Sequence, residues 1–326
     1  MLAVGPNGAG KTNLLESLHV GTQGFSPRTR TDAQLIRLGA DAARVALDGS
    51  RDQVPLAVSV SLSTRAAKRA TLNGARLATA EQLRREIETL VFTPDRLAIV
   101  KGGPAARRAY FDRTLARLQP ARATLSPDYA ATVAQRNAAL RRVASGLSSR
   151  DAIAPWTEQA VALGGELIAA RTETIAALEP GFCEIAGELG LVDATLVYEG
   201  EPASTAALDA RLERDLERAA TSAGPHLHDV RLLSAGRDLR SFGSQGEQRL
   251  TVLALLLAEA RVLASRRDAP PLLLLDDVLS ELDPGRRRVL AGLVAQMGQT
   301  VVTATQRSAL PVEPAQLVEV ELGSAR

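Results

Sequence analysis

The sequence predicts an α/β fold with a mixed or mostly parallel sheet and a second lobe that is mostly helical. Toward the C-terminus, short apolar strand-like segments alternate with helix-like segments, as they do in parallel α/β sheets. Between residues 104 and 187, apolar residues recur at spacings of three and four, which indicates packed helices. Aromatic residues make up only 3% of the chain, so Leu, Val, Ile and Ala must fill the core, which suits helices and parallel strands.

The composition limits the class of protein. A chain of 326 residues with 45% hydrophobic residues can form two lobes without disulfides or structural metals. Its net charge of +2 is too small to identify a nucleic-acid partner, so the distribution of charge has to decide. The single cysteine, Cys183, excludes an internal disulfide. No apolar run reaches the length of a bilayer span and no secretory signal pattern begins the chain, so we expect a cytoplasmic protein.

The first lobe is predicted to begin with residues 1–100, where a glycine-rich turn leads into a helix. Strand-forming segments then indicate a small meander with a tight turn at Asn73-Gly74. Thr79 and Gln82 have the spacing of a capping box that begins a helix. The elements expected in this part are a helix at 11–20 and strands at 44–47, 55–62, 69–77 and 88–92.

The second lobe is predicted over residues 101–222. Its main feature is a stripe of apolar and small residues at helical spacing from Trp156 to Leu178. The expected partner is a helix at 129–143, joined to it through residues 145–150 as a short antiparallel pair. We favour two core helices of a lobe over a projecting coiled-coil arm, because the repeat covers only about three heptads.

Residues 223–326 are predicted to complete the first lobe. The elements expected from residue 194 onward are strands at 194–198, 229–233, 272–275 and 300–303 and helices at 206–220, 244–264 and 284–296. The alternation after residue 244 predicts buried parallel strands covered by helices.

The segment from Gly5 to Thr12, Gly-Pro-Asn-Gly-Ala-Gly-Lys-Thr, fits the P-loop pattern. Glycines let backbone N–H groups surround phosphates, and the helix that follows directs its positive end at them. Lys11 is expected to reach the β- and γ-phosphates of ATP, and the Thr12 hydroxyl to bind Mg²⁺. A glycine turn that begins an ordinary helix is the alternative. The predicted nucleotide-binding residues here are Gly5, Asn7, Gly8, Ala9, Gly10, Lys11, Thr12 and Asn13, with Lys11 also a catalytic candidate.

An apolar strand at 272–275 ends in two acidic residues, Asp276 and Asp277. This arrangement would place one carboxylate near the metal ion and the next near the attacking water. Asp276 is therefore the candidate metal-side ligand and Asp277 the candidate catalytic residue. By itself, the segment also fits a buried strand that ends in exposed acids.

The segment Ser244-Gln-Gly-Glu-Gln-Arg249 lies at the start of a helix about 25 residues before that strand. It resembles the signature motif of ABC-type ATPases, and the order of P-loop, signature, Asp-Asp strand and Ser280-Glu-Leu-Asp283 is the order of that superfamily. Ser244 with Glu247 also fits a helix capping box, and this local role is compatible with nucleotide binding.

Within this superfamily the chain resembles the RecF family of DNA gap-repair ATPases. The similar segments are 5–17, 91–112, 224–230, 243–249 and 272–288. The resemblance implies an ABC-type ATPase head and a homodimer in which ATP on one P-loop is capped by the signature of the other copy. It also implies binding to duplex DNA near single-strand gaps, weak DNA-stimulated ATP hydrolysis, a RecR-type partner and assistance to RecA loading. Residues assigned to the second half of the nucleotide site are Ser244, Gly246, Gln248 and Asp283.

The sequence departs from the family pattern at its beginning, where only Met1 to Val4 precede the P-loop. We therefore expect a chain truncated at its N-terminus. After the predicted strand at 300–303, Thr305 and Gln306 occupy the place where transporter ATPases have a switch histidine, and either is a candidate to replace it.

A third departure lies at 224–229, which retains only part of the family's Gly-Pro-His-Arg-Asp-Asp stretch. For His226 and His228 we favour loop or strand histidines over metal ligands, because no cysteine or carboxylate cluster nearby in the sequence supplies further ligands.

The candidate DNA contacts are basic residues of the predicted helical lobe, which can neutralise phosphates without reading sequence. A solvated helix face is the alternative interpretation of each. No aromatic platform for single strands is evident, so duplex DNA is favoured. The first candidates are Lys101, Arg107, Arg108 and Arg113, followed by Arg117, Arg122, Arg136, Arg141 and Arg142.

Two other functions compete with a repair ATPase. A transporter energising subunit would have Leu-Ser-Gly-Gly-Gln and a switch histidine, and the sequence has neither at the corresponding positions. An interaction protein with an impaired nucleotide site is the second alternative, and a measurement of ATP binding would distinguish it.

Overall fold

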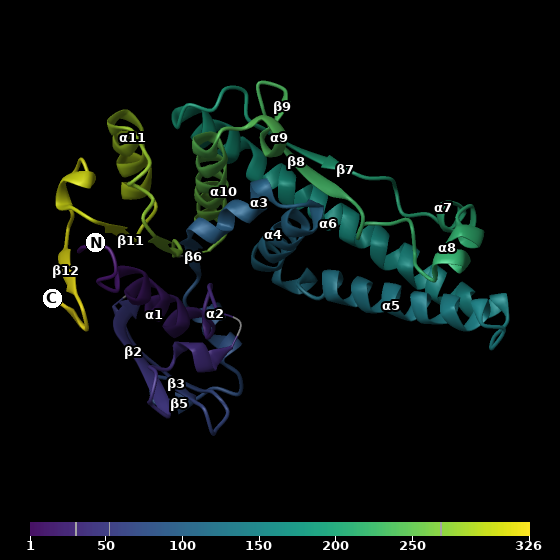
Figure 1. Cartoon of the computed structure of the whole chain (residues 1–326), viewed down its shortest axis with the longest axis horizontal. Helices are drawn as coiled ribbons and strands as arrows, with labels where there is room; N and C mark the ends of the chain where they lie inside the picture. The colour runs from purple at the N-terminus through teal and green to yellow at the C-terminus, as the bar shows by residue number, and fades with distance from the viewer. Residues whose placement is uncertain (30, 52, 268) are drawn as a thin grey trace. The chain divides into compact units, whose positions relative to one another are not determined.

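The computed structural model describes residues 1–29, 31–51, 53–267 and 269–326. By their contacts, these residues divide into two compact units, Met1–Arg96 with Leu263–Arg326 and Leu97–Val262, and helix α10 (Gln245–Arg266) spans the second boundary. The lobes predicted from sequence have their boundaries at residues 100 and 222. Their division into functional lobes stays a prediction. The elements are labelled in Figure 1.

The first unit contains the main sheet, whose strand order is β13-β12-β1-β11-β10-β6. All neighbours in it are parallel except β12 and β13. Its strands are β1 (Leu2–Val4), β6 (Thr89–Phe92), β10 (Leu272–Leu275), β11 (Thr300–Ala304), β12 (Leu317–Glu321) and β13 (Ser324–Ala325). Apolar residues of β1, β6, β10 and β11 are buried, as the predicted strands at 88–92, 272–275 and 300–303 require. The expected α/β class is confirmed.

Residues before the P-loop form a strand of this sheet. Strand β1 lies between β11 and β12, so the glycine-rich turn follows a strand with a neighbour on each side. Helix α1 (Lys11–Gln23) follows the turn and α11 (Pro284–Ala295) precedes β11. Both helices were predicted, and α1 extends about one turn beyond the predicted end at Val20.

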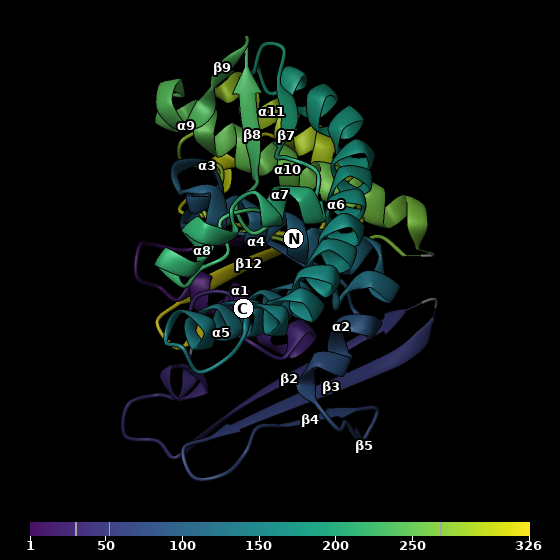
Figure 2. The ribbon, with the colours of Figure 1, turned by 90° about the vertical axis from the view of Figure 1, so that its right-hand side faces the viewer.

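The meander is a separate antiparallel sheet in the first unit, with strand order β2-β3-β4-β5 (Figure 2). Its strands are β2 (Ala42–Arg51), β3 (Val54–Ser63), β4 (Arg69–Leu72) and β5 (Ala75–Arg76). The predicted strand at 69–77 is therefore two strands. Asn73 and Gly74 both have positive φ, 48° and 80°, which is the backbone of a two-residue hairpin turn, so the chain reverses there.

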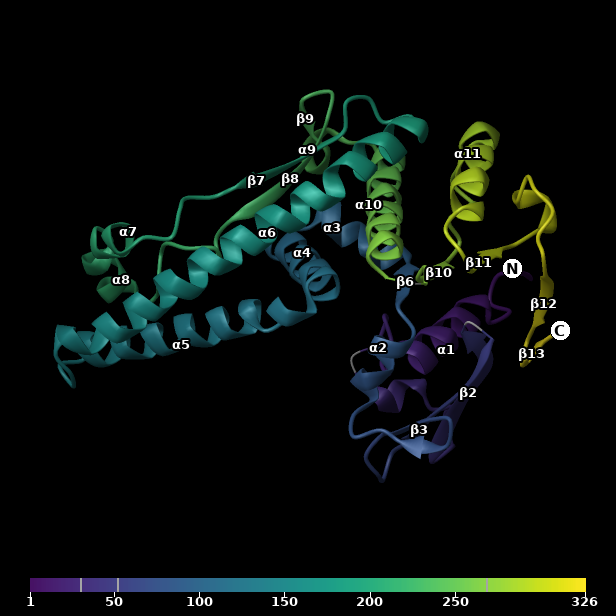
Figure 3. The same cartoon turned by 180° about the vertical axis from the view of Figure 1, so that it is seen from behind.

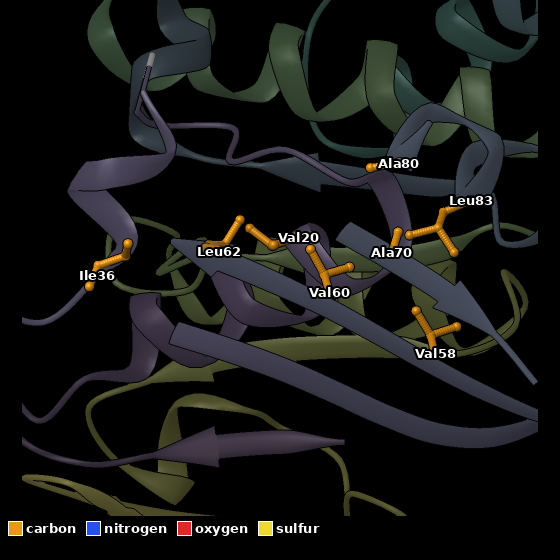
Figure 4. Packing of buried hydrophobic residues seen from close by; sticks show 8 residues of the cluster. All are labelled: Val20, Ile36, Val58, Val60, Leu62, Ala70, Ala80 and Leu83. Carbon is orange, nitrogen blue, oxygen red and sulfur yellow. The ribbon is translucent and has the colours of Figure 1, made fainter. Parts of the chain in front are cut away.

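One face of the meander packs on α1, the 3₁₀ turn Asp32–Leu35 and the short helix α2 (Leu83–Glu86). Figure 4 shows this core, in which alternate residues of β3 point to one side. Its buried members are Val20, Ile36, Val58, Val60, Leu62, Ala70, Ala80 and Leu83. Because strand side chains alternate, the intervening residues of β3 and β4 lie on the opposite face.

The second unit is mostly helical, as predicted. Helices α5 (Leu125–Ala144) and α6 (Ala154–Glu188) lie side by side and run antiparallel (Figures 1 and 3). The predicted stripe packs between them, with Tyr129 and Val133 of α5 against Ala160, Leu167 and Ala170 of α6. The other helices are α3 (Ala98–Lys101), α4 (Pro104–Leu118), α7 (Thr205–Asp209), α8 (Leu212–Arg218), α9 (Leu239–Phe242) and most of α10.

The predicted helix at 206–220 is wrong in one respect, because the chain forms two short helices there. Ser204 caps α7 through a hydrogen bond from the Ala207 N–H, and α8 turns the buried Asp215 toward Arg136. The unit also contains strands β7 (Thr195–Glu199), β8 (Asp229–Ser234) and β9 (Arg237–Asp238) in one antiparallel sheet. Within the described ranges, no helix has both the length and the apolar character needed to cross a bilayer.

Candidate nucleotide-binding site

The P-loop turn joins the end of β1 to the start of α1. Gly8 and Gly10 have φ of 81° and 104°, a backbone region in which other residues are strained. Gly10 is the N-cap of α1 and has no side chain, so the first N–H groups of the helix face outward without a side-chain cap. A Cβ on Gly5 would lie 2.2 Å from the Val320 carbonyl oxygen, so glycine is required there too. This turn is a suitable cradle for phosphates.

Lys11 is the buried cation of this turn, with 9% of its surface exposed. Its ammonium group donates hydrogen bonds to the carbonyl oxygens of Gly5 and Pro6, at 2.7 and 3.0 Å. The side chain therefore folds back over the loop, where phosphate oxygens would compete with these carbonyls for its protons. Asn7, Gly8 and Asn13 are exposed around it and Ala9 is buried below.

Thr12 and Asp276 come together, although they are 264 residues apart. The Thr12 hydroxyl donates to Asp276 Oδ1 at 3.2 Å. Asp276 is buried at the end of β10, and its N–H donates to the Phe92 carbonyl of β6 at 3.0 Å. The structure thus places the two predicted metal ligands in contact beside the P-loop, and their role as ligands stays a prediction.

Thr303 is a residue of this site that the sequence analysis missed. Its side chain is fully buried, and its hydroxyl donates to Asp276 Oδ1 at 2.8 Å while accepting the Asp277 N–H at 2.9 Å. The hydroxyl therefore fixes both acidic residues relative to β11. A hydroxyl residue near the end of the strand beside an Asp-Asp strand is the signal that could have found it.

Asp277 lies just beyond Asp276 and is exposed. Its φ is 49°, which is uncommon outside glycine but is tolerated better by aspartate than by most residues. Its carbonyl oxygen accepts the Ser280 hydroxyl at 3.0 Å, which begins the loop toward α11. Asp277 is thus available at the same sheet edge as the P-loop.

Asp283 caps helix α11. Its carboxylate accepts the Arg286 N–H at 3.0 Å, and this hydrogen bond is the main reason that the pKa of Asp283 lies below its ordinary value. Thr305 and Gln306, the candidates for the switch position, are exposed just after β11. Since the Gly5 N–H donates to the Ala304 carbonyl at 3.3 Å, they follow the strand beside the P-loop strand.

The predicted signature lies in the second unit, at the start of α10. Ser244 and Glu247 form the capping box expected from the sequence, with Glu247 Oε2 accepting the Ser244 N–H at 2.8 Å and Ser244 Oγ accepting the Glu247 N–H at 3.2 Å. Ser244 and Gly246 are exposed. Gln248 is buried and donates to the Leu239 carbonyl at 2.9 Å, which anchors α9 to the helix start. Its contact with nucleotide stays a prediction.

The candidate DNA-binding residues differ in their exposure and in whether their charge is already paired. Arg107 is only 4% exposed and forms a bidentate pair with Asp229 at 2.7 and 2.6 Å, so it does not present a free surface charge. Arg108 is half-buried and donates to the His228 carbonyl at 2.7 Å. Lys101 and Arg113 are exposed. The Arg107 guanidinium already has an anionic partner, and phosphate contact by Arg107 stays a prediction that would require this pair to open.

The basic residues later in the chain also include both buried, paired side chains and exposed ones. Arg136 is 1% exposed and pairs with the fully buried Asp215 at 2.7 Å. Arg117 pairs with the buried Glu259 of α10. Arg122 forms an exposed pair with Glu173. Arg141 and Arg142 are exposed at the end of α5.

The segment at 224–229 is held by surrounding polar side chains. Arg171 donates to the Pro225 carbonyl at 2.7 Å, and Tyr129 contacts His226 Nδ1 at 2.9 Å. His226 Nε2 lies 3.0 Å from the Thr221 carbonyl, which can only accept, so this ring carries its proton on Nε2. Burial lowers the pKa of both His226 and His228. The arrangement is that of structural histidines.

Asp229 completes this network. Burial acts to raise the pKa of its carboxyl group, but the hydrogen bonds and charge of Arg107 outweigh burial and the pKa is lowered. The Arg107–Asp229 pair therefore holds the start of β8 to α4 as an ion pair.

The chain is similar to known proteins over nearly its full length. Residues 1–322 match the family described as RecF/RecN/SMC N terminal domain. A protein of Heliobacterium modesticaldum described as DNA replication and repair protein RecF is 35% identical over 324 residues, which cover 95% of this chain and 87% of that protein. The protein of the same description from Anaeromyxobacter sp. strain K is 39% identical, over 96% of this chain and 87% of that protein.

This chain belongs to the RecF family. A solved structure described as the recombination mediator protein RecF-ATP in the RecFOR pathway has a TM-score of 0.84 and 26% identity, and the similarity covers 100% of this chain and 90% of that one. The resemblance stated from sequence motifs and the ATPase-head fold are thus both confirmed. Membership in a family of DNA replication and repair proteins also removes the support for a transporter subunit.

Proposed function

We propose that this chain, like the RecF-family proteins it resembles, is an ATP-binding DNA repair ATPase that dimerises on ATP and binds duplex DNA near single-strand gaps. The observation that carries the proposal is the 3.2 Å contact between Thr12 and Asp276 beside a P-loop turn. That contact joins the two sequence motifs on which phosphate and metal binding depend. A RecR-type partner and assistance to RecA loading follow from the family resemblance.

ATP binding is supported by the geometry of the P-loop. The outward N–H groups at the start of α1 and the left-handed glycines supply an anion site with a partial positive charge. Lys11 exchanges its two carbonyl partners for β- and γ-phosphate oxygens, which bind an ammonium group more strongly because they are charged. The description of a solved relative as RecF-ATP supports the same ligand.

Mg²⁺ fits the residues present beside the P-loop. Thr12 and Asp276 offer a hydroxyl and a carboxylate oxygen, and Mg²⁺ prefers oxygen donors together with substrate phosphates. When bound, the ion would neutralise charge on the phosphates during transfer. Thr303 keeps the Asp276 carboxylate in place through its 2.8 Å hydrogen bond. The chain itself thus supplies an oriented ligand rather than a mobile one.

Hydrolysis requires a group that orients the attacking water, and Asp277 is our candidate. It lies next to the metal-side residue, is exposed, and is held by the hydrogen bond from its N–H to Thr303. An aspartate at this position has a shorter reach than a glutamate, and we expect slow turnover. Stimulation of that turnover by DNA follows from the family resemblance. The energetic role of hydrolysis is then release of the ATP-bound dimer.

The second half of the nucleotide site comes from another copy of the chain. Ser244 and Gly246 are exposed at the N-terminus of α10, where a helix end and a hydroxyl can meet a γ-phosphate. The capping box fixes the Ser244 backbone before any partner arrives. Asp283, at the start of α11, is assigned to the loop that crosses between the copies. ATP is therefore the link between two chains.

Three variants test the proposal by ATP binding, ATPase rate and sizing with and without duplex DNA. Lys11→Met should abolish ATP binding, and Ser244→Arg should bind ATP but lose ATP-dependent dimers. Asp277→Asn should form dimers and hydrolyse slowly. Wild-type protein that binds ATP yet neither dimerises nor responds to DNA would refute the proposed ATP-dependent dimer on DNA. Wild-type protein that binds no ATP would favour an interaction protein instead.

A further inference from the structure

The outer face of the meander carries exposed arginines on three of its strands. The inner residues of β3 and β4 are buried, so Ser59, Ser61, Arg69 and Thr71 lie on the other side. In the strand register, Arg44 of β2 pairs with Ser61, and Ser61 pairs with Arg69. This places two arginines in one row across the sheet with a serine between them.

A second row lies beside the first. Ser59 of β3 pairs with Thr71 of β4, and Thr71 pairs with Arg76 of β5. We call the surface formed by Arg44, Ser59, Ser61, Arg69, Thr71 and Arg76 the meander face. It consists of long cationic side chains separated by short hydroxyl side chains.

A shallow depression of about 370 Å³ lies on this surface. Arg44 and Arg69 line it together with Ser61 and Ser63. The remaining lining is small or apolar and comprises Ala42, Ala43, Leu62, Ala66 and Ala67. Small side chains allow another molecule to approach the sheet closely, while the arginines supply charge at its edges. None of the lining residues is acidic.

The charge of the meander face is not neutralised internally. Within the described residues, Arg44, Arg69 and Arg76 form no ion pair, and Arg44 Nε donates to the Ser59 hydroxyl at 2.9 Å. Neighbouring cations differ, because Arg65 pairs with Asp41 at 3.2 Å and Lys68 with Asp32 at 3.1 Å. The carboxylate on the outward positions of β2 is Asp48, four residues from Arg44. The row of Arg44 and Arg69 is therefore cationic.

The chemistry of this surface fits phosphate groups. The planar guanidinium group binds phosphate oxygens through paired hydrogen bonds, and serine and threonine hydroxyls add neutral donors. Arg44 and Arg69 lie two strands apart, or about 10 Å, so each can reach a different phosphate. The depression has no aromatic side chain on which a base could stack, so it suits the backbone of a duplex better than a single strand.

We propose that the meander face binds the phosphate backbone of duplex DNA, independently of its sequence. The proposal rests on the proposed function, since it names the surface through which a DNA repair ATPase meets its DNA. Arg44, Arg69 and Arg76 take the role that the sequence analysis gave to Arg107 and its neighbours. Their number sets the electrostatic part of the affinity, because each phosphate contact releases counterions.

The test replaces Arg44, Arg69 and Arg76 together with alanine in the full chain. Binding of a fluorescent 30-base-pair duplex is measured by anisotropy with ATP present, over a range of salt concentrations. A matched control replaces Arg214, Arg218 and Arg237, which are exposed on α8 and β9, and so removes the same formal charge. A third variant replaces the meander arginines with lysine.

The alanine variant should weaken duplex binding by about tenfold or more and reduce the slope of log affinity against log salt by about 2 to 3. The control should stay within about twofold, and the lysine variant should retain most of the wild-type slope because it keeps the charge. Equal losses in the alanine variant and the control would overturn the proposal. A larger loss for single-stranded than for duplex DNA would also overturn it.

ATP binding separates this proposal from the proposed function. The alanine variant should bind ATP as tightly as wild type, which shows that the first unit is folded. Wild-type protein that binds ATP but no duplex DNA would refute the proposed function, whatever the variants do. Wild-type protein that binds duplex DNA with an affinity unchanged in the alanine variant would refute only the meander face.

Discussion

The arginines of the helical unit and those of the meander face differ in what surrounds each guanidinium group. Arg107, Arg136 and Arg171 are nearly fully buried, and each has a carboxylate partner within 2.7 Å. Arg44 and Arg69 are exposed and line an open depression without an anionic partner. Arginine content alone therefore does not identify a phosphate-binding surface, because a buried carboxylate can already neutralise the guanidinium charge.

The physical cause of the difference is desolvation. A buried arginine loses its hydration, so the fold must supply a carboxylate with good geometry in return. The bidentate pair of Arg171 with Asp112, at 2.7 and 2.9 Å, meets that requirement. An exposed arginine keeps its water and can exchange it for a ligand's oxygens. Removing a partner should thus be costly in the helical unit and nearly neutral at the surface.

The largest effect should follow from Asp215→Ala, which leaves Arg136 buried without its anion. Asp215 also accepts the Ser222 N–H at 2.9 Å and the Ser222 hydroxyl at 2.6 Å, so three donors lose this acceptor. We expect the free energy of unfolding to fall by about 3 to 5 kcal/mol. Chemical denaturation measures it, with Glu213→Ala as the control because Glu213 forms an exposed pair with Arg150. Similar losses in the two variants would show that burial does not set the cost of removing an arginine's carboxylate partner.

A second effect concerns the pH dependence of the free energy of unfolding. The segment at 224–229 contains His226 and His228, and burial lowers the pKa of both from 6.5. As pH falls through 6.5, the unfolded chain takes up protons that the folded chain does not. The free energy of unfolding is therefore highest above that pH and falls as pH drops from 7.5 to 5.5.

Urea unfolding at pH 7.5 and at pH 5.5 measures this loss. The variant His226→Gln removes one titrating group while keeping an amide that can donate to the Thr221 carbonyl. Its stability should depend less steeply on pH than that of wild type. A wild-type stability that rises between pH 7.5 and 5.5 would show that these rings are protonated in the folded state.

Local patterns in the sequence were sufficient to predict much of the fold and the local structure of several candidate site residues. The P-loop spacing located the anion turn, and the capping box of Ser244 and Glu247 formed as its four-residue pattern predicts. The apolar strand before Asp276 placed that carboxylate at the right sheet edge. Each of these signals depends on residues that are close in the chain.

Such local patterns could not predict contacts between residues that are distant in the sequence. Arg107 and Asp229 are 122 residues apart, and Arg136 and Asp215 are 79 apart, so nothing local shows that these charges neutralise each other. The basic stretch therefore looked like a DNA surface. Thr303 was missed for the same reason, because it acts through the neighbouring strand rather than through its own segment.

Thr303→Val tests an intermediate case, in which the partner of a buried carboxylate is a hydroxyl rather than a cation. Valine keeps the shape but leaves the Asp277 N–H without its acceptor and Asp276 with one fewer donor. We expect a loss of roughly 1 to 2 kcal/mol in unfolding free energy. The Mg²⁺ concentration needed for half-maximal ATPase activity should also rise. Thr303→Ser, which retains the hydroxyl, should restore that Mg²⁺ dependence, whereas a value unchanged in Thr303→Val would exclude a positioning role.

The smallest effect should come from Arg122→Ala. Arg122 and Glu173 form an ion pair at 2.8 Å, and both side chains are about half exposed, so water and salt screen their attraction. We expect the free energy of unfolding to change by less than about 0.5 kcal/mol. Denaturation at low and high salt provides the measurement, and the double variant Arg122→Ala with Glu173→Ala isolates the pair itself. A coupling energy as large as that of Arg136 with Asp215 would mean that burial does not decide what an arginine of this chain contributes.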